Sequence, residues 1–141
     1  MIRAASILGG RKVLRMEPLS LLDWVHMIRK GFPSKAIDSF GTNIGATNAE
    51  LAQMLGISVR ALAWRRRKGT LTPYESERMF RVARVVGRAE EVFDDLAKGL
   101  EWLKSPNSSL GGTSPMSLLD TCIGADWVME TLGRIEHGVF A

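Results

Sequence analysis

The sequence predicts an all-α protein, with a helix-turn-helix bundle in its N-terminal part and a smaller helical domain after it. Apolar residues recur three and four positions apart along most of the 141 residues, which is the period of a helix that buries one face. Helix-capping residues precede several of these stretches. The alternation typical of strands indicates at most a short strand at residues 12–14. We place the two domains at residues 1–88 and 89–141.

Two helices are expected before the helix-turn-helix. The apolar face of the first consists of Leu21, Leu22, Val25 and Ile28. Gly31 is placed to end this helix, because glycine adopts the backbone conformation that follows many helices. Pro33 suits the first position of the second helix, whose apolar side consists of Ala36, Ile37 and Phe40. Residues 41–46 (GTNIGA) predict a loop.

Capping residues mark the next three helix starts. They are Thr47 with Glu50, Ser58, and Thr72 with Pro73 and Glu75. The helices that they open are expected to end at Leu55, before Gly69 and at about Gly87. The first two of these helices form the predicted helix-turn-helix, over about residues 47–69.

This segment meets the requirements of a DNA-reading helix pair. Ala52 supplies a small residue where the two helices cross, and Gly56 supplies the positive φ of the turn. Apolar anchors come from both helices: Leu51, Leu55, Ile57, Val59 and Leu62. The second helix carries the predicted DNA-binding residues: Arg60, Arg65, Arg66, Arg67 and Lys68. We expect Arg60 to contact bases and residues 65–68 to contact phosphates, although a structural hairpin with a solvated basic face has the same pattern.

Neighbouring residues leave alternatives open. The next helix carries four arginines at near-helical spacing: Arg78, Arg81, Arg84 and Arg88. They either extend the basic surface or pair with acidic residues of the second half. Trp64 stands two positions after Leu62, so both cannot point into one core. We expect Trp64 to pack against a neighbouring helix, with DNA or a second subunit as the alternatives.

The second half predicts three further helices. The first has apolar residues at Ala89, Val92, Phe93, Leu96, Leu100 and Leu103. Residues 106–112 (PNSSLGG) form a turn-rich break, and Ser114-Pro115 starts a short helix with Leu118, Leu119 and Cys122 facing inward. A last helix over residues 124–136 is expected to bury Trp127, Val128, Thr131, Leu132 and Ile135. Gly138 then frees the final residues.

Charge separates the two halves. Residues 1–89 hold 16 Lys and Arg against 6 Asp and Glu, whereas residues 90–141 hold 3 against 9. A basic half with a helix-turn-helix indicates nucleic acid as one partner, and an acidic half indicates another. We expect no membrane span, no signal peptide and a buried, reduced Cys122, which together predict a cytoplasmic protein.

The residue inventory argues against an enzyme. His26 and His137 stand far apart, and neither has metal-ligand spacing with a second ligand. A nucleophilic pair of Cys122 and His137 is disfavoured because periodicity places Cys122 on a buried face. Residues 110–112 lack the lysine of a phosphate loop. We expect no catalytic residue, metal or cofactor.

The C-terminal segment holds a long pattern of fixed spacing, which consists of Trp102-Leu103, Pro106-Asn107, Leu110-Gly111-Gly112, Pro115, Leu118-Leu119, Thr121, Gly124, Val128, Leu132, Arg134 and Ile135-Glu136-His137-Gly138. This pattern closely resembles the toxin-binding domain of the Xre/MbcA/ParS-type antitoxins, which are bacterial partners of RES-domain toxins. The similarity extends through residues 71–86 and the helix-turn-helix, which makes the N-terminal bundle Cro/Xre-like. Trp64 departs from the family, which often has a polar residue at that position.

The resemblance implies an antitoxin of a type II toxin–antitoxin system. Its C-terminal domain is expected to block the active site of an NAD-consuming RES-domain toxin, and its helix-turn-helix to bind operator DNA as a homodimer and repress its own operon. By position, the toxin-binding residues are Arg134, Glu136, His137, Gly138, Val139 and Phe140. The alternatives are a stand-alone transcriptional regulator whose C-terminal half mediates dimerisation, and an adaptor that has lost DNA binding.

Overall fold

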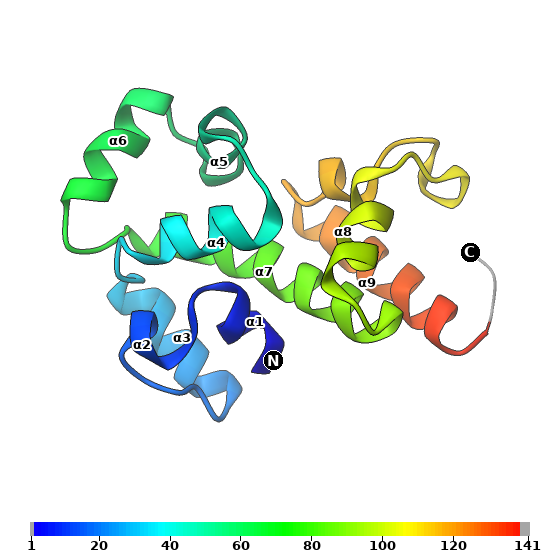
Figure 1. The fold of residues 1–141 in the computed structure, drawn as a ribbon, viewed down its shortest axis with the longest axis horizontal. Coiled ribbons are helices and arrows are strands. Elements are labelled where there is room, and N and C mark those ends of the chain that lie inside the picture. Colours follow the sequence, from blue (N-terminus) through cyan, green and yellow to red (C-terminus); the bar gives the residue numbers. More distant parts are fainter. Residues whose placement is uncertain (1, 139–141) are drawn as a thin grey trace.

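The computed structural model describes residues 2–138, which form nine α-helices and two short 3-10 helices (Figure 1). The α-helices are α1 Ile2–Ile7, α2 Gly10–Leu14, α3 Leu21–Lys30, α4 Ala36–Ile44, α5 Asn48–Leu55, α6 Val59–Arg67, α7 Pro73–Phe93, α8 Leu96–Lys104 and α9 Cys122–Glu136. The 3-10 helices are η1 Ser108–Leu110 and η2 Pro115–Leu118. Over residues 2–138 only isolated bridges occur, and no strand forms. The predicted all-α fold is confirmed.

Helix α7 is shared by two lobes. It packs against α1, α3 and α5, and also against α8 and α9. Figure 1 shows it crossing the molecule from a larger lobe, made of α1–α6, to a smaller lobe made of α8, α9 and the 3-10 helices. With 21 residues it is about 32 Å long. The lobe that holds the helix-turn-helix and the acidic lobe are therefore joined by a single continuous helix.

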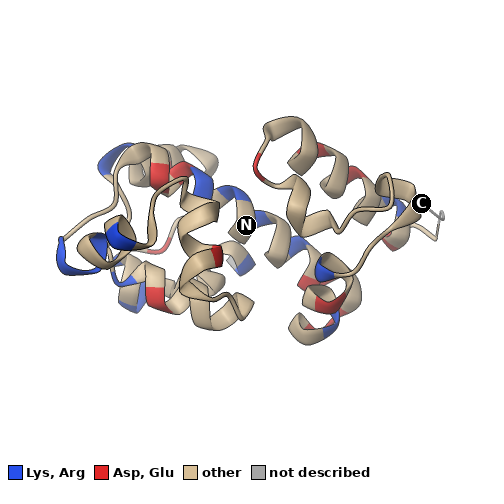
Figure 2. Cartoon of the chain, turned by 90° about the horizontal axis from the view of Figure 1, so that it is seen from above, with Lys and Arg blue, Asp and Glu red and all other residues tan. Residues whose placement is uncertain are grey.

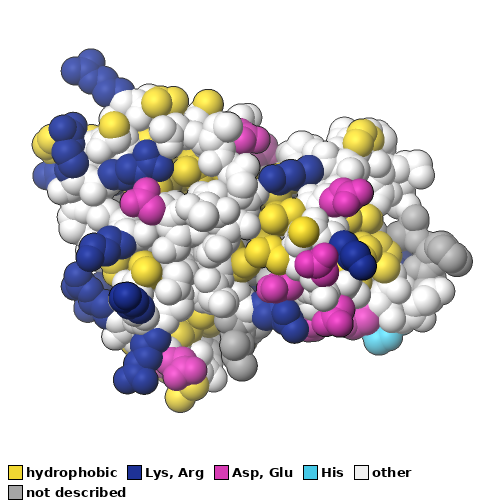
Figure 3. All heavy atoms as spheres, viewed as in Figure 1, with side chains coloured by type: hydrophobic (Ala, Val, Ile, Leu, Met, Phe, Trp, Pro, Cys, Tyr) yellow, Lys and Arg dark blue, Asp and Glu magenta, His cyan; other side chains and the backbone are white. Residues whose placement is uncertain are grey.

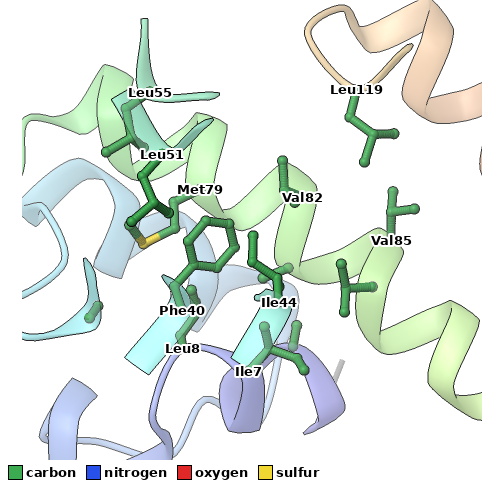
Figure 4. Packing of buried hydrophobic residues seen from close by; sticks show 14 of the residues in the cluster. Ile7, Leu8, Phe40, Ile44, Leu51, Leu55, Met79, Val82, Val85 and Leu119 are labelled. Carbon is green, nitrogen blue, oxygen red and sulfur yellow. The ribbon is translucent and has the colours of Figure 1, made fainter. Parts of the chain in front are cut away.

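The buried apolar residues form one cluster that runs through both lobes. In the larger lobe, Leu8, Phe40 and Met79 are fully buried against one another (Figure 4). Farther along α7, Val82 and Val85 face Leu119 of the smaller lobe (Figure 4). The core therefore extends across the junction between the lobes.

The apolar face predicted for α3 is wrong except for Ile28, which packs half-buried against the core. Leu21 and Leu22 are 68% and 60% exposed, whereas Trp24 and Met27 are buried. The ring of Trp24 lies 4.6 Å from that of Phe80 on α7 and 6.2 Å from that of Phe32. Burying this large aromatic gains more than burying the smaller leucines, so the helix is rotated to place it inward.

Two glycines at which the sequence predicts a break lie inside helices, because they allow close packing. Residues 41–44 continue α4, which ends at Gly45 with a φ of +66°. Gly41 lies inside the helix, where a Cβ would come within 2.9 Å of Leu51 Cδ1. Gly87 lies inside α7, where a Cβ would come within 3.1 Å of the Ala4 nitrogen. α7 therefore continues past its predicted end, to Phe93.

Three further predictions differ from the structure. Asp94, with a φ of +54°, ends α7, and the Asp95 side chain caps α8. The single helix expected from Ala89 to Leu103 is thus divided between α7 and α8. Residues 12–14 belong to α2 rather than to a strand, because no second strand is available to pair with them. Pro33 forms a bridge with Thr70 instead of opening α4.

The smaller lobe confirms the burial of Leu119, Val128, Thr131 and Leu132. Trp127 and Cys122, however, are exposed, and Leu118 and Ile135 are half-buried. Small residues explain the orientation of α9. A Cβ on Gly124 would lie 1.8 Å from the Leu118 carbonyl oxygen, so this face of α9 packs directly on η2. None of the described helices combines the length and apolar character of a membrane span.

Candidate functional site

The helix-turn-helix forms as the sequence predicts, except that Val59, expected as an apolar anchor, is 52% exposed. α5 begins with a capping box between Thr47 and Glu50, and Gly56, with a φ of +72°, makes the turn. The Ser58 hydroxyl accepts a hydrogen bond from the Ala61 N–H and caps α6. Ala52 is buried where the two helices cross. α6 is thus held on the body of the lobe with its opposite side in solvent.

The exposed side of α6 consists of residues at helical spacing: Arg60, Ala63, Trp64 and Arg67. Trp64 is 51% exposed, so our expectation that it packs against a neighbouring helix is wrong. It stays outside because Leu62, two positions earlier, takes the buried position. Arg60 and Arg67 form no ion pair with any described residue.

Arg65 and Arg66 turn toward the protein instead. The Arg65 Nε donates to both carboxylate oxygens of Glu75, at 2.8 and 3.1 Å. The Arg66 Nε lies 3.1 Å from an oxygen of Asp38. The pair with Glu75 attaches the last turn of α6 to the start of α7, whereas Arg66 approaches the exposed Asp38 of α4 as an ion pair in which its Nε makes no hydrogen bond to any residue that the structure describes. Among the five predicted DNA-binding residues, these two are therefore engaged within the chain.

Glu75 is a buried carboxylate with several donors. It accepts a hydrogen bond from the Thr72 N–H in the capping box of α7, besides those from Arg65. Burial on its own would raise the pKa of Glu75, but the hydrogen bonds from Arg65 and Thr72 outweigh it, and the pKa lies below its ordinary value. Glu75 is therefore a charged residue that positions α6 against α7.

Lys68 closes α6 beside a loop from the other side of the lobe. The Ser34 hydroxyl donates to the Lys68 carbonyl, and the Ser34 N–H donates to the Gly69 carbonyl. The Lys68 ammonium lies 4.7 Å from the centre of the Trp64 ring, and the Arg67 guanidinium lies 5.9 Å from it. Two cations therefore lie near the Trp64 ring.

Three of the four arginines predicted on α7 form hydrogen bonds or ion pairs with other residues of this chain. Arg78 donates to the Met54 carbonyl at the end of α5, and Arg81 donates to the Leu119 carbonyl of the smaller lobe. Arg88 pairs with Glu91 and Glu136. Arg84 is exposed. Figure 2 shows a group of Lys and Arg toward the outer end of the larger lobe, with others near the middle of the molecule and in the smaller lobe, and Figure 3 shows that group on the surface.

The outward face of α9 combines apolar and polar residues. Ile123 is 82% exposed and Trp127 is 40% exposed, one helical turn apart. Arg134 and His137 follow on the same face, and Arg134 pairs with Glu130 within the helix. Three carboxylates border the apolar pair: Asp120, Asp126 and Glu130. We name Ile123, Trp127, Glu130, Arg134 and His137 the α9 face.

Glu136 belongs to the opposite side of α9. Its two oxygens accept hydrogen bonds from Arg88 at 2.6 and 2.9 Å. These bonds lower the pKa of Glu136 and raise the pKa of Arg88. Gly138 has a φ of +76°, and Val139 and Phe140 lie outside the described residues. The structure therefore separates Arg134 and His137 from Glu136.

No catalytic arrangement is found in the described part of the chain. Cys122 and His137 stand at opposite ends of α9, about 22 Å apart along the helix. The Arg81 guanidinium, 3.4 Å from the Cys122 sulfur, is its partner. No three His, Cys, Asp or Glu side chains within residues 2–138 are grouped to hold a metal ion. A cleft of about 400 Å³ lies between α5, α8 and η2.

Comparisons with known proteins assign both lobes. Residues 23–84 match the antitoxin Xre-like helix-turn-helix domain, and residues 88–138 match the antitoxin Xre/MbcA/ParS C-terminal toxin-binding domain. A protein named antitoxin Xre from Yersinia enterocolitica is 41% identical over 83% of this chain and 80% of its own length. The chain belongs to the Xre antitoxin family.

Other relatives agree with this membership. Antitoxin Xre from Photorhabdus laumondii is 35% identical over 80% of this chain and 78% of its own length. A Sphingobium protein named Prs ADP-ribosylating antitoxin is 26% identical over 86% of this chain and 83% of its own. The family is one of antitoxins with a helix-turn-helix domain and a toxin-binding domain.

Sequence reasoning missed two exposed apolar residues of this family member's toxin-binding domain. The apolar period of the last helix predicts that Trp127 lies in the core, and it gives no prediction for Ile123. Both lie on α9 opposite its buried residues Val128 and Leu132. Helical spacing from Gly124 and Ala125, the smallest residues of the buried face, is the signal that could have identified them.

Proposed function

We propose that this chain neutralises a RES-domain toxin that consumes NAD, by covering the toxin's active site with the α9 face and the tail after Gly138. The observation that carries the proposal is the exposure of Ile123 and Trp127 within the toxin-binding domain. Burying two large apolar side chains in a partner contributes roughly 3–6 kcal/mol. The name of the Sphingobium relative supports an NAD-consuming partner, since NAD is the usual donor in ADP-ribosylation.

Arg134 and His137 are proposed to make the polar contacts around this apolar anchor. They lie on the same face as Ile123 and Trp127, and among residues 2–138 the exposed Arg134 pairs only with Glu130 of its own helix. Glu136 is proposed to act indirectly, because its pair with Arg88 holds the end of α9 against α7. Gly138, Val139 and Phe140 remain proposed as the segment that enters the toxin's pocket.

Co-expression with the protein encoded by the neighbouring gene tests this function. The double variant Ile123→Ser with Trp127→Ser is expected to lose rescue of growth, while Tyr74→Ser, which removes an exposed aromatic from the other lobe, is expected to retain it. Purified complexes measured by calorimetry should show the same ranking. Failure of the unmodified chain to rescue growth would exclude the antitoxin function altogether.

We also propose that the chain represses its own operon by binding operator DNA as a homodimer. The basic outer end of the larger lobe and the exposed Arg60, Arg67 and Lys68 support DNA binding. The exposed Leu21 and Leu22 of α3 support self-association through an apolar surface. Operator titrations at several salt concentrations test the first claim, because Arg67→Ala should flatten the log–log slope by about 0.9. Sedimentation of Leu21→Ser with Leu22→Ser tests the second.

A further inference from the structure

The DNA-facing side of α6 has an unusual composition for a surface that binds phosphates. Between Arg60 and Arg67 stand Ala63 and Trp64, and Val59, before them, is 52% exposed. Ala63 and Trp64 share the outward side of α6 with Arg60 and Arg67, and Val59 is exposed at the start of the helix, whereas Arg65 and Arg66 pair with other residues of the chain. An apolar surface of this kind gains nothing from phosphate but can contact bases.

We propose that Trp64 is a specificity-determining residue that reads the C5-methyl group of a thymine in the major groove. Thymine presents the one apolar group on the floor of that groove, and apolar side chains are its usual partners. This proposal rests on the operator binding proposed above. It assigns Trp64 a role in choosing the sequence rather than in supplying affinity.

The position of Trp64 along α6 fits this role. It lies four residues after Arg60, about 6 Å along the helix, which is within two base-pair steps of 3.4 Å. An arginine in the first turn can bond guanine while the indole reaches a nearby step. Lys68, 4.7 Å from the ring centre, and Arg67 then stand beside the groove, where phosphates lie.

The cations also explain how an exposed indole is kept in place. Lys68 and Arg67 lie 4.7 and 5.9 Å from the centre of the Trp64 ring, and their attraction to the ring favours this orientation of the indole. A restrained aromatic loses little conformational freedom when it binds. Trp64 is therefore suited to discriminate between bases that differ by one methyl group.

The test replaces thymine by uracil, which removes only the C5-methyl group. A duplex is first selected from random sequences with the full-length chain, and each thymine is then replaced in turn. At one position, replacing thymine by uracil is expected to weaken binding about fourfold, which is the effect of withdrawing one methyl group from a contact. Trp64→Ala should bind the thymine and uracil duplexes equally, whereas Trp127→Ala should keep the discrimination. Trp64→Phe, which retains an apolar ring, controls for loss of folding and should keep part of it.

The outcomes distinguish thymine reading by Trp64 from the operator binding on which it rests. Equal binding of all uracil duplexes by the unmodified chain overturns thymine reading and leaves operator binding intact. Discrimination that persists in Trp64→Ala also overturns it, because another residue then contacts the methyl group. Failure of the unmodified chain to select any duplex overturns operator binding itself.

Discussion

Arg65 is the residue for which structure and sequence give the most different predictions. From the sequence it contacts DNA phosphate, so its loss should weaken DNA binding and leave the fold unchanged. In the structure its side chain is 26% exposed and pairs with Glu75, whose side chain is 4% exposed. Arg65→Ala would leave the Glu75 carboxylate buried with its capping hydrogen bond but without a countercharge.

The magnitude follows from the burial of the pair. Removing one partner of a buried ion pair costs about 3–5 kcal/mol. The partial exposure of Arg65 and the remaining bond from Thr72 favour the lower end, about 3 kcal/mol, which corresponds to roughly 10 °C in the melting temperature of a chain of this size. Combining Arg65→Ala with Glu75→Gln should recover part of the loss, since no unpaired charge remains.

Thermal unfolding followed by circular dichroism measures this effect. Arg67→Ala is the matched control, because Arg67 is an exposed arginine of the same helix without an ion pair to the described residues. Its melting temperature should stay within about 2 °C of the unmodified chain. Equal melting temperatures for the Arg65 and Arg67 variants would refute the reasoning and return Arg65 to the DNA-binding surface.

Lowering the pH should also reveal the contribution of the Arg65–Glu75 pair to stability. The folded pKa of Glu75 is below its ordinary value of 4.5, so its contribution to stability is fully present above that value. The contribution is lost as the pH falls through the folded pKa, because both states are then protonated. The difference in unfolding free energy between the unmodified chain and Glu75→Gln should therefore shrink below pH 4.5, and a constant difference would contradict this role.

Three glycine substitutions give further predictions, each measured by urea unfolding. Gly124→Ala should destabilise the chain by at least about 3 kcal/mol, because its Cβ would lie 1.8 Å from the Leu118 oxygen. Gly133→Ala on the same helix meets no atom within 4 Å and should stabilise it by about 0.5–1 kcal/mol. Gly56→Ala should cost about 1–2 kcal/mol, since its φ of +72° strains any other residue.

Local signals in the sequence predicted the helix starts well. The caps at Thr47, Ser58 and Thr72 each form in the structure, because a cap depends on residues within one turn. Burial was predicted less well, since it depends on which helices meet. The exposure of Leu21 and the burial of Trp24 follow from the position of Phe80 on α7, fifty-six residues later.

The candidate sites also divide into features that local sequence determines and features that depend on distant residues. The helix-turn-helix was predictable from Ala52 and Gly56, whose roles are local to the motif. The pairing of Arg65 was not, because Glu75 already served in a recognisable capping box and nothing in its spacing indicates a second partner. The exposure of Trp127 depends on the contact between Gly124 and η2. The period of the large apolar residues places Trp127 in the core, and only the small residues Gly124 and Ala125 mark the face that is buried.

The continuity of α7 leads to a last prediction, on the boundary that we place between residues 88 and 89. Val82 and Val85 stand before it and pack toward Leu119, and the Arg81 guanidinium donates to the Leu119 carbonyl at 3.3 Å. A fragment of residues 89–141 would lose these contacts, so it should remain largely unfolded and fail to bind toxin. A fragment of residues 72–141 keeps all of α7 with its capping box and should be more helical per residue and bind. Circular dichroism and calorimetry compare the two, and a folded, toxin-binding 89–141 fragment would show that the toxin-binding domain is independent of α7.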